Sequence, residues 1–201
     1  MSLLVVDRLQ RSFGGVRAVD GVSFTLDADH LAALIGPNGA GKSTLFNLID
    51  GQIAPESGSV RYEGQPLAGL STAQRTRRGI GRTFQVAQTF ATMTVLQNAQ
   101  LALTVAHGNA ERTVSALWNL HADAARSLLL KVGLEARSDS AASELAYGDL
   151  KRLELALALA TRPRLLLMDE PTAGMAPAER TALMQLVAQL ARELSIAVLF
   201  T

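Results

Sequence analysis

The chain has 201 residues, enough for one domain with a substantial core and too few for two. Lysine and arginine number 19 against 18 aspartates and glutamates, so the formal net charge of +1 gives no field that would favour nucleic acid or an anionic membrane surface as a partner. Cysteine is absent, which excludes a disulfide framework and a thiolate metal centre.

The N-terminal segment, Met1 to Gln10, lacks the features of a signal peptide because Asp7 and Arg8 interrupt its apolar stretch. The most apolar region, around Leu153 to Leu167, also contains charged residues and is not a candidate membrane helix. We therefore expect a cytoplasmic chain. If it works at a membrane, another chain has to span the bilayer.

Short apolar or β-branched runs, separated by glycine and aspartate clusters, predict strands in the N-terminal part of the chain. These predicted strands are Leu3 to Val6, Val22 to Leu26, Leu31 to Ile35 and Val60 to Tyr62. Beyond Gln85 the pattern changes. Thr94 to Thr104 and Ala122 to Val132 are rich in alanine and leucine without β-branched clusters, which predicts helices and hence an inserted helical lobe.

The C-terminal part alternates strand and helix signals. Leu165 to Met168 is a continuous apolar run of strand length, Ala178 to Leu194 has apolar residues at helical spacing, and Ile196 to Phe200 has the character of a buried strand. A strand, helix, strand order predicts a parallel sheet.

A glycine-rich segment follows the predicted strand Leu31 to Ile35 and opens a predicted helix, Ser43 to Ile49. Its residues are Gly36, Pro37, Asn38, Gly39, Ala40, Gly41, Lys42, Ser43 and Thr44. The segment matches the pattern G-x-x-x-x-G-K-[ST] in the strand, loop, helix setting that the pattern requires, which disfavours the alternative of an ordinary turn. Backbone N–H groups and the helix N-terminus would bind phosphate, Lys42 would contact the β- and γ-phosphates, and Ser43 would offer its hydroxyl to Mg²⁺.

Two carboxylates, Asp169 and Glu170, follow the predicted strand Leu165 to Met168 at the sheet edge where α/β proteins bind ligands. We expect Asp169 to hold Mg²⁺ through water or through the ligand shell that it shares with Ser43, and Glu170 to polarise the attacking water. A solvated pair that caps the strand is the alternative, and the nearby phosphate loop disfavours it.

The order of these segments resembles the ABC ATPase family. The resemblance implies an α/β P-loop NTPase with ABC-type N-terminal antiparallel strands, a parallel core sheet and an inserted helical subdomain. The expected RecA-like core comprises residues 1–85 and 149–201, and the helical subdomain comprises residues 86–148. Phe13 matches the aromatic residue that stacks on adenine in this family, with a core role as the alternative. Gln85 matches the glutamine loop, which implies contact with Mg²⁺ and the attacking water.

The segment Leu145 to Asp149 matches the family's signature segment, which implies that Tyr147 and Gly148 bind the γ-phosphate held by a second subunit. It departs from the common L-S-G-G-Q form. The sequence Leu-Ala-Tyr-Gly is similar to the form of this segment in ATPase subunits of branched-chain amino acid importers. ATPase subunits of urea importers are close relatives of that group. Pro171 to Pro177 matches the family's D-loop, but Ala176 stands where relatives usually carry Asp or Asn.

Family members carry a histidine after the strand that follows the D-loop helix, where it contacts the γ-phosphate. The histidines of this chain, His30, His107 and His121, all lie upstream, and the sequence ends at Thr201. We therefore expect a C-terminally truncated chain, in which the loss of a group that acts in the transition state would lower turnover more than ATP affinity.

Together these features predict an ATP-binding and ATP-hydrolysing subunit that uses Mg²⁺ and energises an importer for branched-chain amino acids or related solutes such as urea. The expected partners are transmembrane permease subunits, a second ATPase subunit and, indirectly, a solute-binding protein, with no nucleic acid. The expected location is peripheral, on the cytoplasmic face of the membrane. Two alternatives are a non-hydrolysing or defective ATP-binding fragment and a soluble ABC protein of translation or DNA maintenance; the length and charge disfavour the second.

An apolar cluster near Gln85 is the predicted docking groove for the permease. Its members are Val86, Phe90, Met93 and Leu96. The alternative is that these side chains form the core of the helical lobe.

Overall fold

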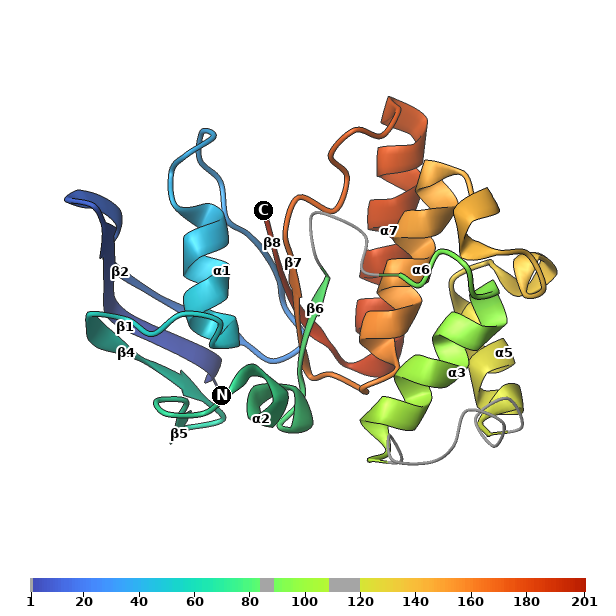
Figure 1. Ribbon diagram of the computed structural model, residues 1–201. Helices are drawn as coiled ribbons and strands as arrows, with labels where there is room; N and C mark the ends of the chain where they lie inside the picture. The colour runs from blue at the N-terminus through green and yellow to red at the C-terminus, as the bar shows by residue number, and fades with distance from the viewer. Residues whose placement is uncertain (1, 84–88, 109–119) are drawn as a thin grey trace. The chain divides into compact units, whose positions relative to one another are not determined.

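The computed structural model describes residues 2–83, 89–108 and 120–201 (Figure 1). The chain divides into two compact units. The first comprises Met1–Arg82, Arg164–Asp169 and Ala191–Thr201, and the second comprises Thr83–Pro163 and Glu170–Leu190. The subdomain boundaries expected from the sequence, 1–85 and 149–201 against 86–148, stay a prediction.

The first unit contains an antiparallel sheet with the strand order β2-β1-β4-β5. Its strands are β1 (Ser2–Phe13), β2 (Val16–Asp27), β4 (Ser57–Tyr62) and β5 (Gln65–Pro66). A tight turn at Gly14 and Gly15, both with positive φ, connects β1 to β2. The N-terminal strands predicted from the sequence are confirmed, although β1 and β2 extend well beyond the apolar runs that indicated them.

A second sheet in this unit has the strand order β3-β8-β7-β6. Its strands are β3 (Leu31–Ala33), β6 (Ile80–Thr83), β7 (Leu165–Met168) and β8 (Ala197–Phe200). β8 pairs in parallel with both β3 and β7, which confirms the predicted parallel sheet. All four residues of β7 are buried, as expected for a strand covered on both faces.

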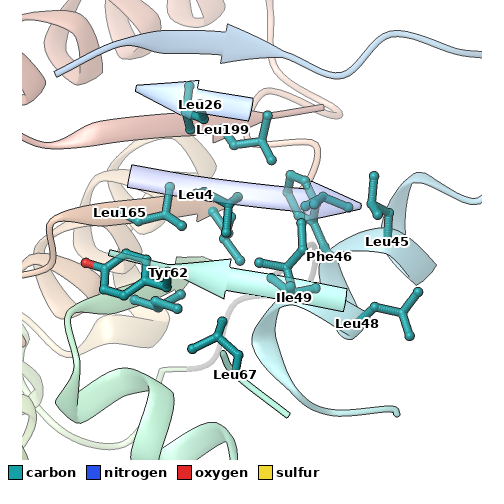
Figure 2. Packing of buried hydrophobic residues seen from close by; sticks show 14 of the residues in the cluster. Leu4, Leu26, Leu45, Phe46, Leu48, Ile49, Tyr62, Leu67, Leu165 and Leu199 are labelled. Atoms are coloured by element: carbon teal, nitrogen blue, oxygen red, sulfur yellow. The ribbon is translucent and has the colours of Figure 1, made fainter. Parts of the chain in front are cut away.

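Helix α1 (Lys42–Asp50) contributes several fully or almost fully buried apolar side chains to the hydrophobic core of the first unit. Figure 2 shows its apolar side chains gathered with side chains from both sheets. The labelled members are Leu4, Leu26, Leu45, Phe46, Leu48, Ile49, Tyr62, Leu67, Leu165 and Leu199. This burial fixes α1, and therefore the loop that precedes it, against the sheets.

A short helix, α2 (Thr72–Arg77), follows β5. The Ser71 side chain accepts from the Gln74 backbone N–H, and the Gln74 side chain accepts from the Ser71 backbone N–H, so a capping box starts the helix.

The second unit is helical in its described parts. Its helices are α3 (Val95–Ala106), α5 (Ala122–Lys131), α6 (Tyr147–Leu159) and most of α7 (Pro177–Leu194), with 3₁₀ turns at Glu135–Arg137 and Ala142–Glu144. The helices predicted in this part of the chain, Thr94 to Thr104, Ala122 to Val132 and Ala178 to Leu194, are confirmed with small shifts at their ends. Within the described residues, no helix combines the length and apolar character needed to cross a membrane.

Candidate nucleotide-binding site

The loop from Gly36 to Gly41 connects β3 to α1. The Ala40 N–H donates to the Pro37 carbonyl at 3.2 Å, which closes a turn inside the loop. Gly41 precedes α1 with φ 85°, and a Cβ at this position would lie 1.8 Å from the Ala18 carbonyl oxygen. Only glycine fits here, because any side chain would collide with the backbone of β2.

The Lys42 side chain folds back over this loop. Its Nζ donates to the Gly36 carbonyl at 2.8 Å and to the Pro37 carbonyl at 2.9 Å, so the ammonium group lies where the loop curves. Among the described residues, no side chain caps the N-terminus of α1. The first N–H groups of a helix without such a cap, together with a lysine ammonium, form a site that suits phosphate oxygens.

Asp169 follows β7 and is almost fully buried, with 4% of its surface exposed. The Thr201 hydroxyl donates to Asp169 Oδ1 at 3.1 Å, and Arg82 Nη2 lies 3.7 Å from Oδ2. The next residue, Glu170, has φ 45°, in the left-handed region that residues other than glycine seldom adopt. Backbone conformations of this kind are strained, and they are found frequently at functional sites.

The described side chains include no cluster of three or more His, Cys, Asp or Glu residues that could hold a metal ion by themselves. Asp169 and the exposed Ser43 offer a carboxylate and a hydroxyl, both hard oxygen ligands. This sparse donor set fits Mg²⁺ that takes most of its ligands from phosphate and water, since Mg²⁺ is usually bound by one or two protein groups plus substrate phosphates.

Phe13 ends β1 and is 46% exposed. The Arg11 guanidinium lies 5.0 Å from the ring centroid, in cation–π range. The ring is therefore accessible to a flat ligand, and its stacking on adenine stays a prediction. Gln85 and Val86 lie outside the described residues.

In the second unit, Tyr147 and Gly148 form the first turn of α6. The Tyr147 hydroxyl donates to the Ala173 carbonyl at 3.1 Å, so it connects the start of α6 to the loop 171–176. This loop is also held by Glu179, which accepts from the Ala176 N–H at 3.3 Å, and by Arg180, whose Nε donates to the Met175 carbonyl at 2.8 Å.

The exposures within the predicted docking groove differ. Phe90 is 55% exposed, whereas Met93 and Leu96 are half-buried. Asn98 fixes the backbone of this segment: its Oδ1 accepts from the Phe90 N–H at 2.8 Å, and its Nδ2 donates to the Phe90 carbonyl at 3.1 Å. The docking role of these residues stays a prediction.

A family model described as "ABC transporter" matches residues 19–173. The chain belongs to the ABC transporter family. It is 40% identical to the high-affinity branched-chain amino acid transport ATP-binding protein LivG of Salmonella typhimurium, over 94% of this chain and 76% of that protein. It is 36% identical to the corresponding BraF protein of Pseudomonas aeruginosa, over 98% of this chain and 80% of that protein.

Solved structures agree with this assignment. The ADP conformation of an ATP-binding cassette of an ABC transporter matches with a TM-score of 0.86 and 32% identity, over 100% of this chain and 80% of that one. A nucleotide-free cassette of an ABC transporter matches with a TM-score of 0.85 and 31% identity, over 100% and 81%. The expected fold class is confirmed, and the chain is an ATP-binding, ATP-hydrolysing subunit of the ABC family that belongs to a transporter complex.

Within this ABC subunit, the sequence indicated the phosphate loop and the acidic pair, and it missed three residues around them. Arg82 and Thr201 both contact Asp169, and Arg75 binds the end of α1. The sequence around these arginine and threonine residues does not indicate the contacts that they make. Only the folded chain brings them to their partners.

Proposed function

We propose that this chain binds MgATP at the loop 36–44 and hydrolyses it to energise an importer of branched-chain amino acids or related small solutes such as urea. The observation that carries the proposal is the complete phosphate loop between β3 and α1, with the Lys42 ammonium at its centre. Two observations support the substrate class. They are the names of the LivG and BraF relatives and the sequence Leu-Ala-Tyr-Gly at residues 145–148.

In this proposal each part of the first unit has one task. Phe13 stacks on the adenine ring, and the N–H groups of the loop bind the phosphate oxygens. These loop residues are Gly36, Pro37, Asn38, Gly39, Ala40, Gly41, Lys42, Ser43 and Thr44, of which Pro37 contributes only its shape and its carbonyl. Ser43 and Asp169 would hold Mg²⁺, which supplies charge neutralisation for the phosphates.

Hydrolysis needs a group that orients water in line with the γ-phosphate. We assign this role to Glu170, because a carboxylate beside the metal-binding Asp169 can accept a proton from water. Gln85 would contribute to the same water and to Mg²⁺. The first turn of α6, with Tyr147 and Gly148, would bind the γ-phosphate held by a second ATPase subunit, since helix N-termini favour anions.

The proposed assembly contains two ATPase subunits, which are either identical or different, and the transmembrane permease subunits. A solute-binding protein would deliver the solute from the other side. This assembly places the chain on the cytoplasmic face of the membrane. Phe90 and its neighbours would provide the permease contact.

The proposal is tested by Mg²⁺-dependent ATP hydrolysis of the chain beside Lys42→Ala and Glu170→Gln. We expect Lys42→Ala to weaken ATP binding by about tenfold or more. Glu170→Gln should bind ATP and lose about 100-fold or more in turnover. ATP binding without hydrolysis in the unaltered chain would contradict the catalytic part of the proposal.

The substrate class is tested in the host cell. Deletion of the gene should lower the uptake of labelled leucine, isoleucine and valine, and the Lys42→Ala gene should fail to restore it. Loss of urea uptake alone would move the assignment to the related solutes. Uptake of all these solutes at the wild-type rate would contradict the importer assignment.

A further inference from the structure

Arg82, in β6, lies between two buried carboxylates of the first unit. Its Nη1 is 3.3 Å from Asp50 Oδ2, and its Nη2 is 3.7 Å from Asp169 Oδ2. The Arg82 side chain is 7% exposed, against 2% for Asp50 and 5% for Asp169. A guanidinium suits this position because its planar fork presents several N–H donors in fixed directions, which a lysine ammonium cannot do.

The two carboxylates belong to different parts of the proposed site. Asp50 is the last residue of α1, the helix that begins at Lys42 and carries Ser43 in its first turn. Asp169 stands at the end of β7. Arg82 therefore connects the far end of the phosphate-loop helix to the acidic residue that follows β7.

Further hydrogen bonds hold both carboxylates. Gln52 Nε2 donates to Asp50 Oδ2 at 3.0 Å, and the Thr201 hydroxyl donates to Asp169 Oδ1 at 3.1 Å. The two oxygens of Asp169 thus have different partners, Thr201 on one and Arg82 on the other. Rotation of this carboxylate about its χ2 axis would break both contacts, so its orientation is set by the pair.

We propose that Arg82 is a positioning residue for the Mg²⁺ site. It fixes the Asp169 carboxylate in the orientation in which Asp169 would hold Mg²⁺. This inference rests on the proposed role of Asp169. Partners of metal-binding carboxylates typically change metal affinity by about 10- to 100-fold when they are removed.

If Arg82 formed only a structural ion pair with Asp50, its removal would change the stability of the fold and not the affinity for the metal. Removing Arg82 alone would leave the buried charge of Asp50 without this partner, and the loss of stability would obscure any effect on the metal. The informative variant is Asp50→Asn with Arg82→Gln, because it removes both charges together and spares Asp169. Asp50→Asn alone is the matched control, since it leaves Arg82 beside Asp169.

The measurement is Mn²⁺ binding to the chain with bound ADP, and the electron paramagnetic resonance signal of free Mn²⁺ reports the binding. Circular dichroism checks that each variant is folded. We expect the double variant to bind ADP without metal within about threefold of the unaltered chain and to lose about tenfold in Mn²⁺ affinity. Asp50→Asn should stay within about threefold for both, because Arg82 remains in contact with Asp169. If the double variant fails to fold, Arg82→Lys takes its place, and a loss of about threefold or more in Mn²⁺ affinity is expected because lysine lacks the fork.

Asp169→Asn separates the two proposals. If Asp169→Asn binds Mn²⁺ as tightly as the unaltered chain, the metal role of Asp169 is wrong. If Asp169→Asn loses the metal while the folded double variant, or Arg82→Lys in its place, keeps it, the metal role stands and the role of Arg82 is overturned.

Discussion

Arg75→Met should destabilise the first unit more than any exposed substitution in the same helix. Arg75 lies in α2, is 5% exposed, and donates hydrogen bonds to four backbone carbonyls. These carbonyls belong to Leu48, Ile49, Leu67 and Leu70, at 2.9, 2.7, 2.9 and 3.1 Å. Leu48 and Ile49 lie in the last turn of α1, whose carbonyls have no partner within the helix.

Methionine keeps the apolar stem and removes every donor. Each buried carbonyl left without a partner costs about 1–3 kcal/mol, and the guanidinium no longer has to be desolvated. Burial already lowers the pKa of Arg75, an effect that the nearby Asp50 opposes. Water can reach some of the four carbonyls after the substitution, so we expect a net loss of about 3–4 kcal/mol.

The assay is urea unfolding followed by circular dichroism at 222 nm, with Arg77→Met as the control. Arg77 lies in the same helix and is exposed, so its substitution should change the free energy of unfolding by less than about 0.5 kcal/mol. A loss below about 1 kcal/mol for Arg75→Met, or equal losses for the two variants, would refute the idea that Arg75 holds the end of α1.

Three further predictions concern the loop, the core and the signature segment. Gly41→Ala should lower ATP affinity by about tenfold or more in titration calorimetry, because its Cβ would meet the Ala18 carbonyl. Gly39→Ala should lower ATP affinity by less, because no described atom lies within 4 Å of its Cβ. Burial raises the pKa of Tyr62 to about 12, so the Tyr62 hydroxyl ionises at a lower pH in the unfolded chain than in the folded chain. The free energy of unfolding should therefore fall by about 1–2 kcal/mol between about pH 10 and 12. Tyr62→Phe should abolish this pH dependence in urea unfolding. Tyr147→Phe removes the hydroxyl that holds the loop 171–176, so kcat for ATP should fall by about threefold or more while the melting temperature changes little; an unchanged kcat would contradict this role.

The phosphate loop and the parallel sheet could be predicted from the sequence because both have strong local signals. Gly36 to Thr44 has a fixed pattern in a fixed setting, and the buried run Leu165 to Met168 has the composition of a doubly covered strand.

Short polar elements could not be predicted in the same way. β6, Ile80–Thr83, contains glycine and arginine and has no apolar alternation, and α2 spans six mostly polar residues. Their places follow from tertiary pairing and from the buried Arg75. The start of α6 at Tyr147 is also hard to predict because Gly148 and Asp149 are common in turns, although an acidic residue near a helix N-terminus is favourable.

The site residues differ in the same respect. Lys42 and Asp169 belong to patterns that neighbouring residues complete. The roles of Arg82 and Thr201 depend on their contacts with Asp169. Asp169 lies far from Arg82 in sequence, so no local sequence rule could predict these contacts.

Equilibrium binding of a fluorescent ATP analogue to the chain, beside Lys42→Ala, tests most directly whether the loop 36–44 binds the phosphates of ATP. The geometry at Lys42 predicts saturable binding that weakens by about tenfold or more in Lys42→Ala while the circular dichroism spectrum stays unchanged. Equal affinity of the two proteins, or binding that unlabelled ATP does not displace, would contradict the account.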